Sequence, residues 1–125
     1  MTMDNSGTVV LIGDPVLRAI ARDVIVGMGY CVFEADDITA LPADPPTSTV
    51  LLSLLVEEPA SSISQAIRSM RLLGYQVPIV VMAPQVGWEL RQRALVNGAV
   101  DTVNLTAPVR EVQDRLRAAL AAPNP

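Results

Sequence analysis

The sequence contains no histidine and no lysine, and it has one cysteine. Without histidine there is no His-based catalytic triad, no usual general base near neutral pH, and no ligand for most kinds of zinc site. The cysteine, Cys31, has no second cysteine for an internal disulfide, and we expect it to pack as a small apolar side chain. The composition thus excludes these particular kinds of site. We predict, for reasons given below, a protein that is not an enzyme and that holds neither a metal ion nor another cofactor.

Strong positive charge and long apolar runs are also missing. The formal net charge is −4, and no run of arginines provides the basic surface that nucleic-acid binding needs. No apolar stretch approaches the roughly 18 residues that span a membrane. The polar beginning MTMDNSG lacks the basic and apolar parts of a signal sequence. We expect a cytoplasmic protein that binds neither nucleic acid directly nor a membrane.

Aromatic residues make up only 3% of the chain, whereas half of all residues are apolar. The core must therefore be aliphatic, which suits a parallel sheet covered by helices on both faces. A chain of 125 residues is long enough for one domain with a sizeable core. We expect a single domain over 1–125, with loose tails at 1–7 and 123–125.

Apolar runs alternate with segments of helical periodicity along the whole chain. Short loops between parallel strands require right-handed crossover helices, so the pattern predicts an α/β fold. We expect this fold to be a flavodoxin-like, doubly wound, five-stranded parallel sheet with the strand order 2-1-3-4-5. Its last strand is less apolar and is expected at an edge. The strands are expected at 8–14, 30–35, 49–56, 77–83 and 99–105, and the helices at 15–29, 61–74, 85–98 and 108–122.

Two features of the helices are specific. The second helix is expected to be short or degenerate, with one turn at 38–41, because three prolines follow it directly. Asp14 before Pro15 is a good N-cap for the first helix. We expect Arg18 on the outer side of that helix. The residues expected to face the sheet are Val16, Leu17, Ile20, Ala21, Val24 and Met28.

Four sequence stretches in the same order resemble the receiver domain of bacterial response regulators, over nearly the whole chain. Each stretch alone is a weak signal, but together they are more specific. They are DPVLR at 14–18, GYCVFEADD at 29–37, VPIVVMAP at 77–84 and ALVNGAVDTVNLTAP at 94–108.

The resemblance implies a known chemistry, in which a partner kinase phosphorylates an aspartate at the end of the third strand. An acidic pair after the first strand holds Mg²⁺, since this hard cation prefers oxygen ligands. A Thr or Ser after the fourth strand and a Lys after the fifth bind the phosphoryl oxygens. In this sequence the acidic pair falls on Ile12 and Gly13, or on Gly13 and Asp14 after a shift of one residue. The acceptor falls on Ser53, or on Leu55 if Pro59 is the anchor. The hydroxyl falls on Ala83, and the Lys on Leu105 or Thr106.

These positions lack the chemistry that the family needs. Ser53 is a weak nucleophile without a base, and no lysine exists anywhere in the chain to replace the missing one. We therefore expect a pseudo-receiver, which is a phosphorylation-independent regulatory domain of bacterial signal transduction, related to two-component and phosphorelay proteins. It would act by binding a protein partner or by forming a homodimer. The residues expected on the interaction face are Trp88, Arg91, Asp101, Glu111 and Arg115.

Several alternatives remain open. Trp88 is either an anchor in a protein interface or partly buried against the sheet, and the charged face is either an interface or a solvated surface. An unorthodox active receiver would use Asp14 with Glu57 or Glu58. A flavodoxin-like domain that binds a small ligand or nucleotide would use the carboxyl ends of the strands near Gly13.

Overall fold

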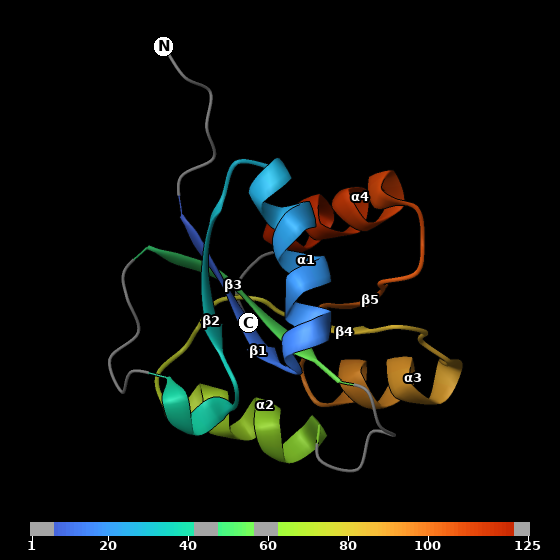
Figure 1. The fold of residues 1–125 in the computed structure, drawn as a ribbon. Helices are drawn as coiled ribbons and strands as arrows, with labels where there is room; N and C mark the ends of the chain where they lie inside the picture. Colours follow the sequence, from blue (N-terminus) through green and yellow to red (C-terminus); the bar gives the residue numbers. More distant parts are fainter. Residues whose placement is uncertain (1–6, 42–47, 57–62, 122–125) are drawn as a thin grey trace.

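The computed structural model describes residues 7–41, 48–56 and 63–121. These residues form a five-stranded parallel sheet of order β2-β1-β3-β4-β5, with α1 and α4 on one face and α2 and α3 on the other (Figure 1). The predicted flavodoxin-like, doubly wound topology is confirmed. The elements are β1 Thr8–Gly13, α1 Pro15–Gly27, β2 Cys31–Ala35, η1 Ile38–Ala40, β3 Thr49–Leu55, α2 Ile63–Leu72, β4 Ile79–Ala83, α3 Trp88–Val96, β5 Asp101–Asn104 and α4 Val109–Leu120.

The two faces of the sheet have separate aliphatic cores. Successive residues of a strand point to opposite faces, so Leu51 of β3 packs toward α1 and α4, whereas Leu52 packs toward α2 and α3. Both side chains are fully buried. Burial on both faces explains why the central strands β1, β3 and β4 read as continuous apolar runs rather than as alternating ones.

Helix α1 begins as predicted but turns a different face to the sheet. One carboxylate oxygen of Asp14 accepts hydrogen bonds from the backbone N–H groups of Val16 and Leu17, at 2.9 and 3.1 Å. Val16 is nevertheless 68% exposed and Ile20 44% exposed, so both were assigned to the wrong side. The contact face centres instead on the buried residues Leu17, Arg18, Ala21, Val24 and Ile25.

Arg18 is buried because α1 also packs beside the edge strand β2. Its guanidinium lies 2.6 Å from a carboxylate oxygen of Asp36 and 3.6 Å from one of Glu34. Burial of a guanidinium is tolerated where carboxylates neutralise it. The prediction that Arg18 lies on the outer side was wrong. The spacing of residues along one helix does not reveal that Glu34 and Asp36, in and just after β2, supply acidic partners for an inward-facing arginine.

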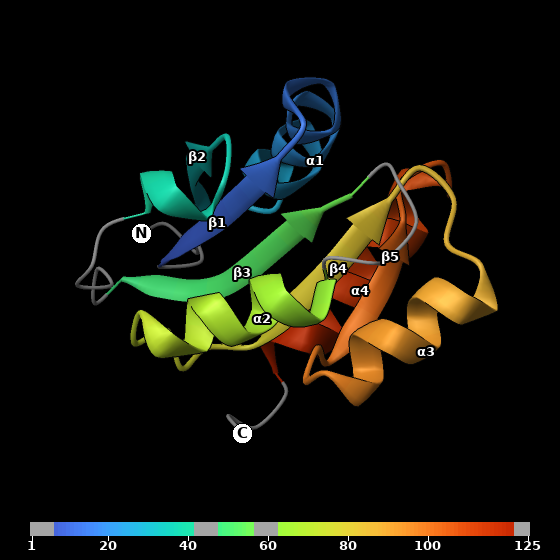
Figure 2. The same cartoon turned by 90° about the horizontal axis from the view of Figure 1, so that it is seen from below.

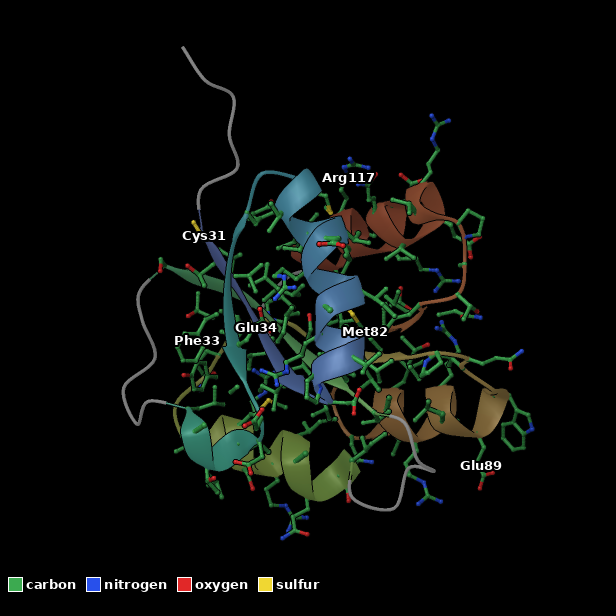
Figure 3. All side chains as sticks on the ribbon, viewed as in Figure 1. Cys31, Phe33, Glu34, Met82, Glu89 and Arg117 are labelled. Carbon is green, nitrogen blue, oxygen red and sulfur yellow. The ribbon has the colours of Figure 1, made fainter. Side chains whose placement is uncertain are left out.

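The predictions for the remaining elements had mixed outcomes. The single turn between β2 and β3 is the 3₁₀ helix η1, capped by Asp37, and β5 lies at an edge, so both predictions are confirmed. The three prolines lie outside the described residues. Cys31 is exposed, and Figure 3 places it at the rim of the molecule, so its predicted packing was wrong. The reason is that it begins the edge strand β2, where it pairs with Thr8 on one side only.

In the described part of the chain, no helix combines the length and the apolar character that crossing a membrane requires.

Candidate functional site

The carboxyl ends of the three central strands meet at one edge of the sheet. Proteins with this sheet topology usually bind their ligands at that edge. Figure 2 shows β1, β3 and β4 running in the same direction to this edge. Gly13 pairs with Leu55, and Leu55 pairs with Met82. The structure therefore brings together Gly13, Asp14, Leu55 and Ala83, and Ile12 lies one residue behind them.

Ser53 lies away from this edge, inside the sheet. It pairs with Leu11 of β1 and Val80 of β4, two residues before the end of β3. Its side chain is 0% exposed, and its hydroxyl oxygen has no hydrogen-bond partner among the described residues. Leu55, the other residue considered for the acceptor position, ends β3 and is 4% exposed. A buried hydroxyl and a buried alkyl group thus occupy the two candidate positions.

Gly13 holds β1 and β3 in close contact at the edge. Its φ is +137°, and a Cβ atom built there would lie 2.3 Å from the carbonyl oxygen of Leu55. Both the backbone conformation and the lack of space require glycine. No carboxylate can stand at this position without separating the ends of the two strands.

The remaining pocket positions also carry no charge directed at a ligand. Ala83 and Leu105 are buried apolar side chains, and the carboxylate of Asp14 caps α1. The hydroxyl of Thr106 donates a 2.7 Å hydrogen bond to the side-chain oxygen of Asn104. Within 7–41, 48–56 and 63–121, no group of three or more acidic or sulfur side chains is placed to hold a metal ion. Glu57 and Glu58 lie outside the described residues.

A hollow of about 480 Å³ lies beside the ends of β1 and β3, between η1 and α2. Ile12, Leu54 and Leu55 contribute apolar lining, and Asp36 and Asp37 contribute carboxylates. None of its described lining residues is basic. Phosphate-binding sites need backbone N–H groups or cationic side chains directed at the ligand, so this hollow is unfavourable for a nucleotide.

An ion-pair cluster joins α3, β5 and α4 at the far edge of the sheet. Asp101 of β5 accepts hydrogen bonds from Arg91 of α3 at 2.8 Å and from Arg115 of α4 at 2.9 Å. Its side chain also accepts from the backbone N–H of Thr102, whose own hydroxyl accepts from Arg91 at 3.0 Å. Sequence reasoning did not include Thr102, since a threonine inside a strand gives no signal of such a contact.

The cluster determines the ionisation of Asp101. Burial raises the pKa of its carboxyl group, but the hydrogen bonds from Arg91, from the backbone of Thr102 and from Arg115 lower it more. The pKa of Asp101 is therefore below its ordinary value. The carboxylate stays ionised at neutral pH and holds the two helices to the edge strand.

Three of the five residues predicted for the interaction face thus meet in one cluster. Glu111 lines the same hollow of about 220 Å³ between α3 and α4 as Arg91 and Arg115. Trp88 lies outside this cluster and is 76% exposed, so its partial burial against the sheet was the wrong alternative.

No protein-family model and no curated protein matches this sequence. Solved structures of receiver domains match the fold over nearly their whole length. A response regulator from Thermotoga maritima has a TM-score of 0.74 at 16% identity, covering 94% of this chain and 100% of that chain. The non-phosphorylated HemR receiver domain from Leptospira biflexa has a TM-score of 0.74 at 19% identity, covering 95% and 98%.

A third solved structure contains a bound magnesium ion. It is the receiver domain of the sensor histidine kinase PA1611 from Pseudomonas aeruginosa PAO1, with a magnesium ion coordinated in the active site cleft. Its TM-score is 0.72 at 20% identity, covering 94% of this chain and 100% of that chain. At these identities the likeness establishes a shared fold.

Proposed function

We propose that this chain is a pseudo-receiver, a regulatory domain of bacterial two-component or phosphorelay signalling that acts without being phosphorylated. It catalyses no reaction, works in the cytoplasm, and binds a protein through the surface of α3, β5 and α4. The observation that supports this proposal best is the close contact of Gly13 with Leu55, where a receiver would hold its acidic pair beside the acceptor.

The phosphoryl transfer of a receiver domain uses a carboxylate acceptor, a metal ion and a cation for the developing charge. In this chain the candidate acceptor positions are Ser53 and Leu55, both buried. Of the described carboxylates near this edge, Asp14 caps α1, Asp36 pairs with Arg18, and Asp37 caps η1. No lysine exists to bind the phosphoryl oxygens. The unorthodox active receiver would therefore have to assemble its site from carboxylates that already have these structural roles, or from residues outside the described ranges.

The edge of the sheet formed by α3, β5 and α4 carries ordered charges and exposed apolar side chains. The cluster of Asp101 with Arg91 and Arg115 fixes α3 and α4 against β5. Trp88 stands exposed at the beginning of α3, and tryptophan is enriched among the residues that dominate binding energies. These features support a role in protein binding.

The proposal is tested by incubating the protein with acetyl phosphate and Mg²⁺ and measuring its intact mass. We expect no added phosphoryl group, while an active receiver domain treated in parallel gains one. A phosphoryl group added to this chain under those conditions, and held on an aspartate or glutamate side chain, contradicts the proposal and supports the unorthodox active receiver.

The hollow beside η1 and α2 supports ligand binding as a second candidate function. Its carboxylates and apolar lining suit a neutral or cationic ligand better than a nucleotide. Thermal shift against a panel of nucleotides and cationic amphiphiles tests this candidate, because a ligand that binds the folded state alone raises its melting temperature. If no compound of the panel raises the melting temperature, this candidate function is rejected.

A further inference from the structure

Strand β2 has a neighbouring strand on one side of its backbone and none on the other. It stands at the end of the sheet, and among the described residues β1 alone pairs with it (Figure 2). The backbone N–H of Cys31 donates a 3.1 Å hydrogen bond to the carbonyl oxygen of Gly7, so it points toward β1. The backbone groups of alternate residues point to opposite sides of a strand. The N–H and C=O groups of Val32 and Glu34 therefore point outward, where another strand can pair with them.

The usual protections of an edge strand are missing from β2. Its sequence, CVFEA, contains neither lysine nor proline. Its one charged side chain, Glu34, turns onto the face covered by α1, where its carboxylate lies 2.7 Å from Arg22 and 3.6 Å from Arg18. The opposite edge strand, β5, instead holds Asp101 in an ion-pair cluster with α3 and α4. Of the two edges, β2 is therefore the one that is open to another chain.

Phe33, the one phenylalanine of the chain, lies at the middle of this edge. Its side chain points to the same face of the sheet as that of Ala35, which belongs to the core beneath α2. It is nevertheless 40% exposed, and Figure 3 shows it at the margin of the molecule near the exposed Cys31. An aromatic side chain and unpaired outward backbone groups thus lie together on one short strand.

The edge is complementary to itself in one antiparallel register. With a two-fold axis at Phe33, Val32 of each copy lies opposite Glu34 of the other, and the two residues of each pair exchange both backbone hydrogen bonds. This register uses every outward N–H and C=O group of both strands. Phe33 faces Phe33 of the other copy at a non-hydrogen-bonded position, where opposite side chains are closest. A two-fold homodimer requires such self-complementarity.

The neighbouring registers are less favourable. An axis at Glu34 places the two Glu34 carboxylates directly opposite each other, and like charges at opposite positions are destabilising. An axis at Val32 pairs Glu34 with Tyr30, whose backbone N–H already donates to the carbonyl oxygen of Ile25. The axis at Phe33 avoids both costs.

Helix α1 enlarges the contact. It packs on β1 and β2, so joining two copies of β2 places the two copies of α1 about two strand spacings apart. This distance of about 10 Å is that between packed helices. Val26 is 55% exposed and lies one turn after Arg22, which reaches Glu34 of β2. Val26 therefore stands on the side of α1 that is nearest to the second copy.

We propose that β2 pairs with β2 of a second copy of this chain, antiparallel about a two-fold axis at Phe33, so that the two sheets become one continuous sheet. This surface lies at the opposite edge of the sheet from that of α3, β5 and α4, and the inference goes beyond the proposed function. The contact is one short strand and one side of a helix, which is below the area of stable interfaces. The dimer is therefore weak and forms at high concentration.

Disulfide cross-linking tests the register. In a Cys31→Ser background, Phe33→Cys places two thiols opposite each other across the axis, and mild oxidation is expected to give a covalent dimer. The wild type is the matched control, because Cys31 is exposed on the same strand and face but lies opposite Ala35 of the other copy. The inference is overturned if the variant cross-links no faster than the wild type.

Sedimentation equilibrium tests the backbone pairing. Val32→Pro removes an N–H that points away from β1, so the monomer is expected to stay folded by circular dichroism while the dimer weakens about tenfold or more. Val32→Ala is the matched control, since it also loses packing of the valine against the core but keeps the N–H and is expected to keep most of the affinity. Equal weakening by the two variants contradicts the pairing, and a wild type that stays monomeric at about 1 mM refutes the dimer. Neither result affects the phosphorylation assay, which tests the proposed function.

Discussion

Replacing Ser53 with alanine is expected to make this protein more stable. The hydroxyl lies between Leu11 and Val80 in the core, is 0% exposed, and has no hydrogen-bond partner among the described residues. A buried polar group without a partner costs about 1–3 kcal/mol. Removing one oxygen sacrifices less packing than removing a methylene, which is worth about 0.8 kcal/mol. The balance predicts that Ser53→Ala raises the free energy of unfolding by about 1 kcal/mol.

The matched control is Thr102→Val, which also removes a buried hydroxyl. Thr102 is 4% exposed, but its hydroxyl accepts a 3.0 Å hydrogen bond from Arg91. This variant is therefore expected to lose about 1 kcal/mol. Urea denaturation followed by far-ultraviolet circular dichroism measures both effects, since Trp88 is too exposed to report on unfolding. An increase of about 0.5 M in the urea midpoint of Ser53→Ala is expected.

A decrease in the midpoint of Ser53→Ala, of the size found for Thr102→Val, refutes the reasoning, because it means that the Ser53 hydroxyl has a partner. The variant Ser53→Asp extends the test to function. A carboxylate buried at this site without a partner costs several kcal/mol, comparable to the whole stability of a typical domain. Unfolding of Ser53→Asp would show that this position cannot carry the receiver's acceptor.

Two further predictions concern the edge of the sheet and the ion-pair cluster. Gly13→Ala places a Cβ atom 2.3 Å from the carbonyl oxygen of Leu55 at a positive φ, so it is expected to lower the free energy of unfolding by at least about 2 kcal/mol in urea denaturation. A loss below about 0.5 kcal/mol contradicts the close contact. Arg91 and Arg115 help to lower the pKa of Asp101 in the folded protein. The ionised carboxylate therefore stabilises the fold at pH values above about 4, which is the pKa of an aspartate in the unfolded chain. This contribution is lost as the pH falls through the lower pKa of the folded state. The stability difference between wild type and Asp101→Asn should therefore shrink below about pH 4, and a difference that is constant between pH 7 and pH 2 contradicts this linkage.

The sequence alone determined the topology and the absence of lysine and histidine from any site the chain can form. Five apolar runs separated by helical segments leave few ways to connect parallel strands, because the crossovers must be right-handed. Asp14 before Pro15 indicated the beginning of α1, since capping depends on neighbours in the chain. The missing lysine and histidine are properties of composition, so no arrangement of the chain can supply them.

Only the tertiary structure decided how the sheet edge and the helix surfaces are used. The register of β3 against β1 placed Leu55, rather than Ser53, beside Gly13. A shift of one residue reverses which face a strand residue points to, and the sequence does not specify that register by itself. Likewise, Arg18 is buried and Trp88 exposed because of where β2 and β5 lie relative to α1 and α3. Burial depends on what packs against a side chain, and for these residues the packing partners come from distant parts of the chain.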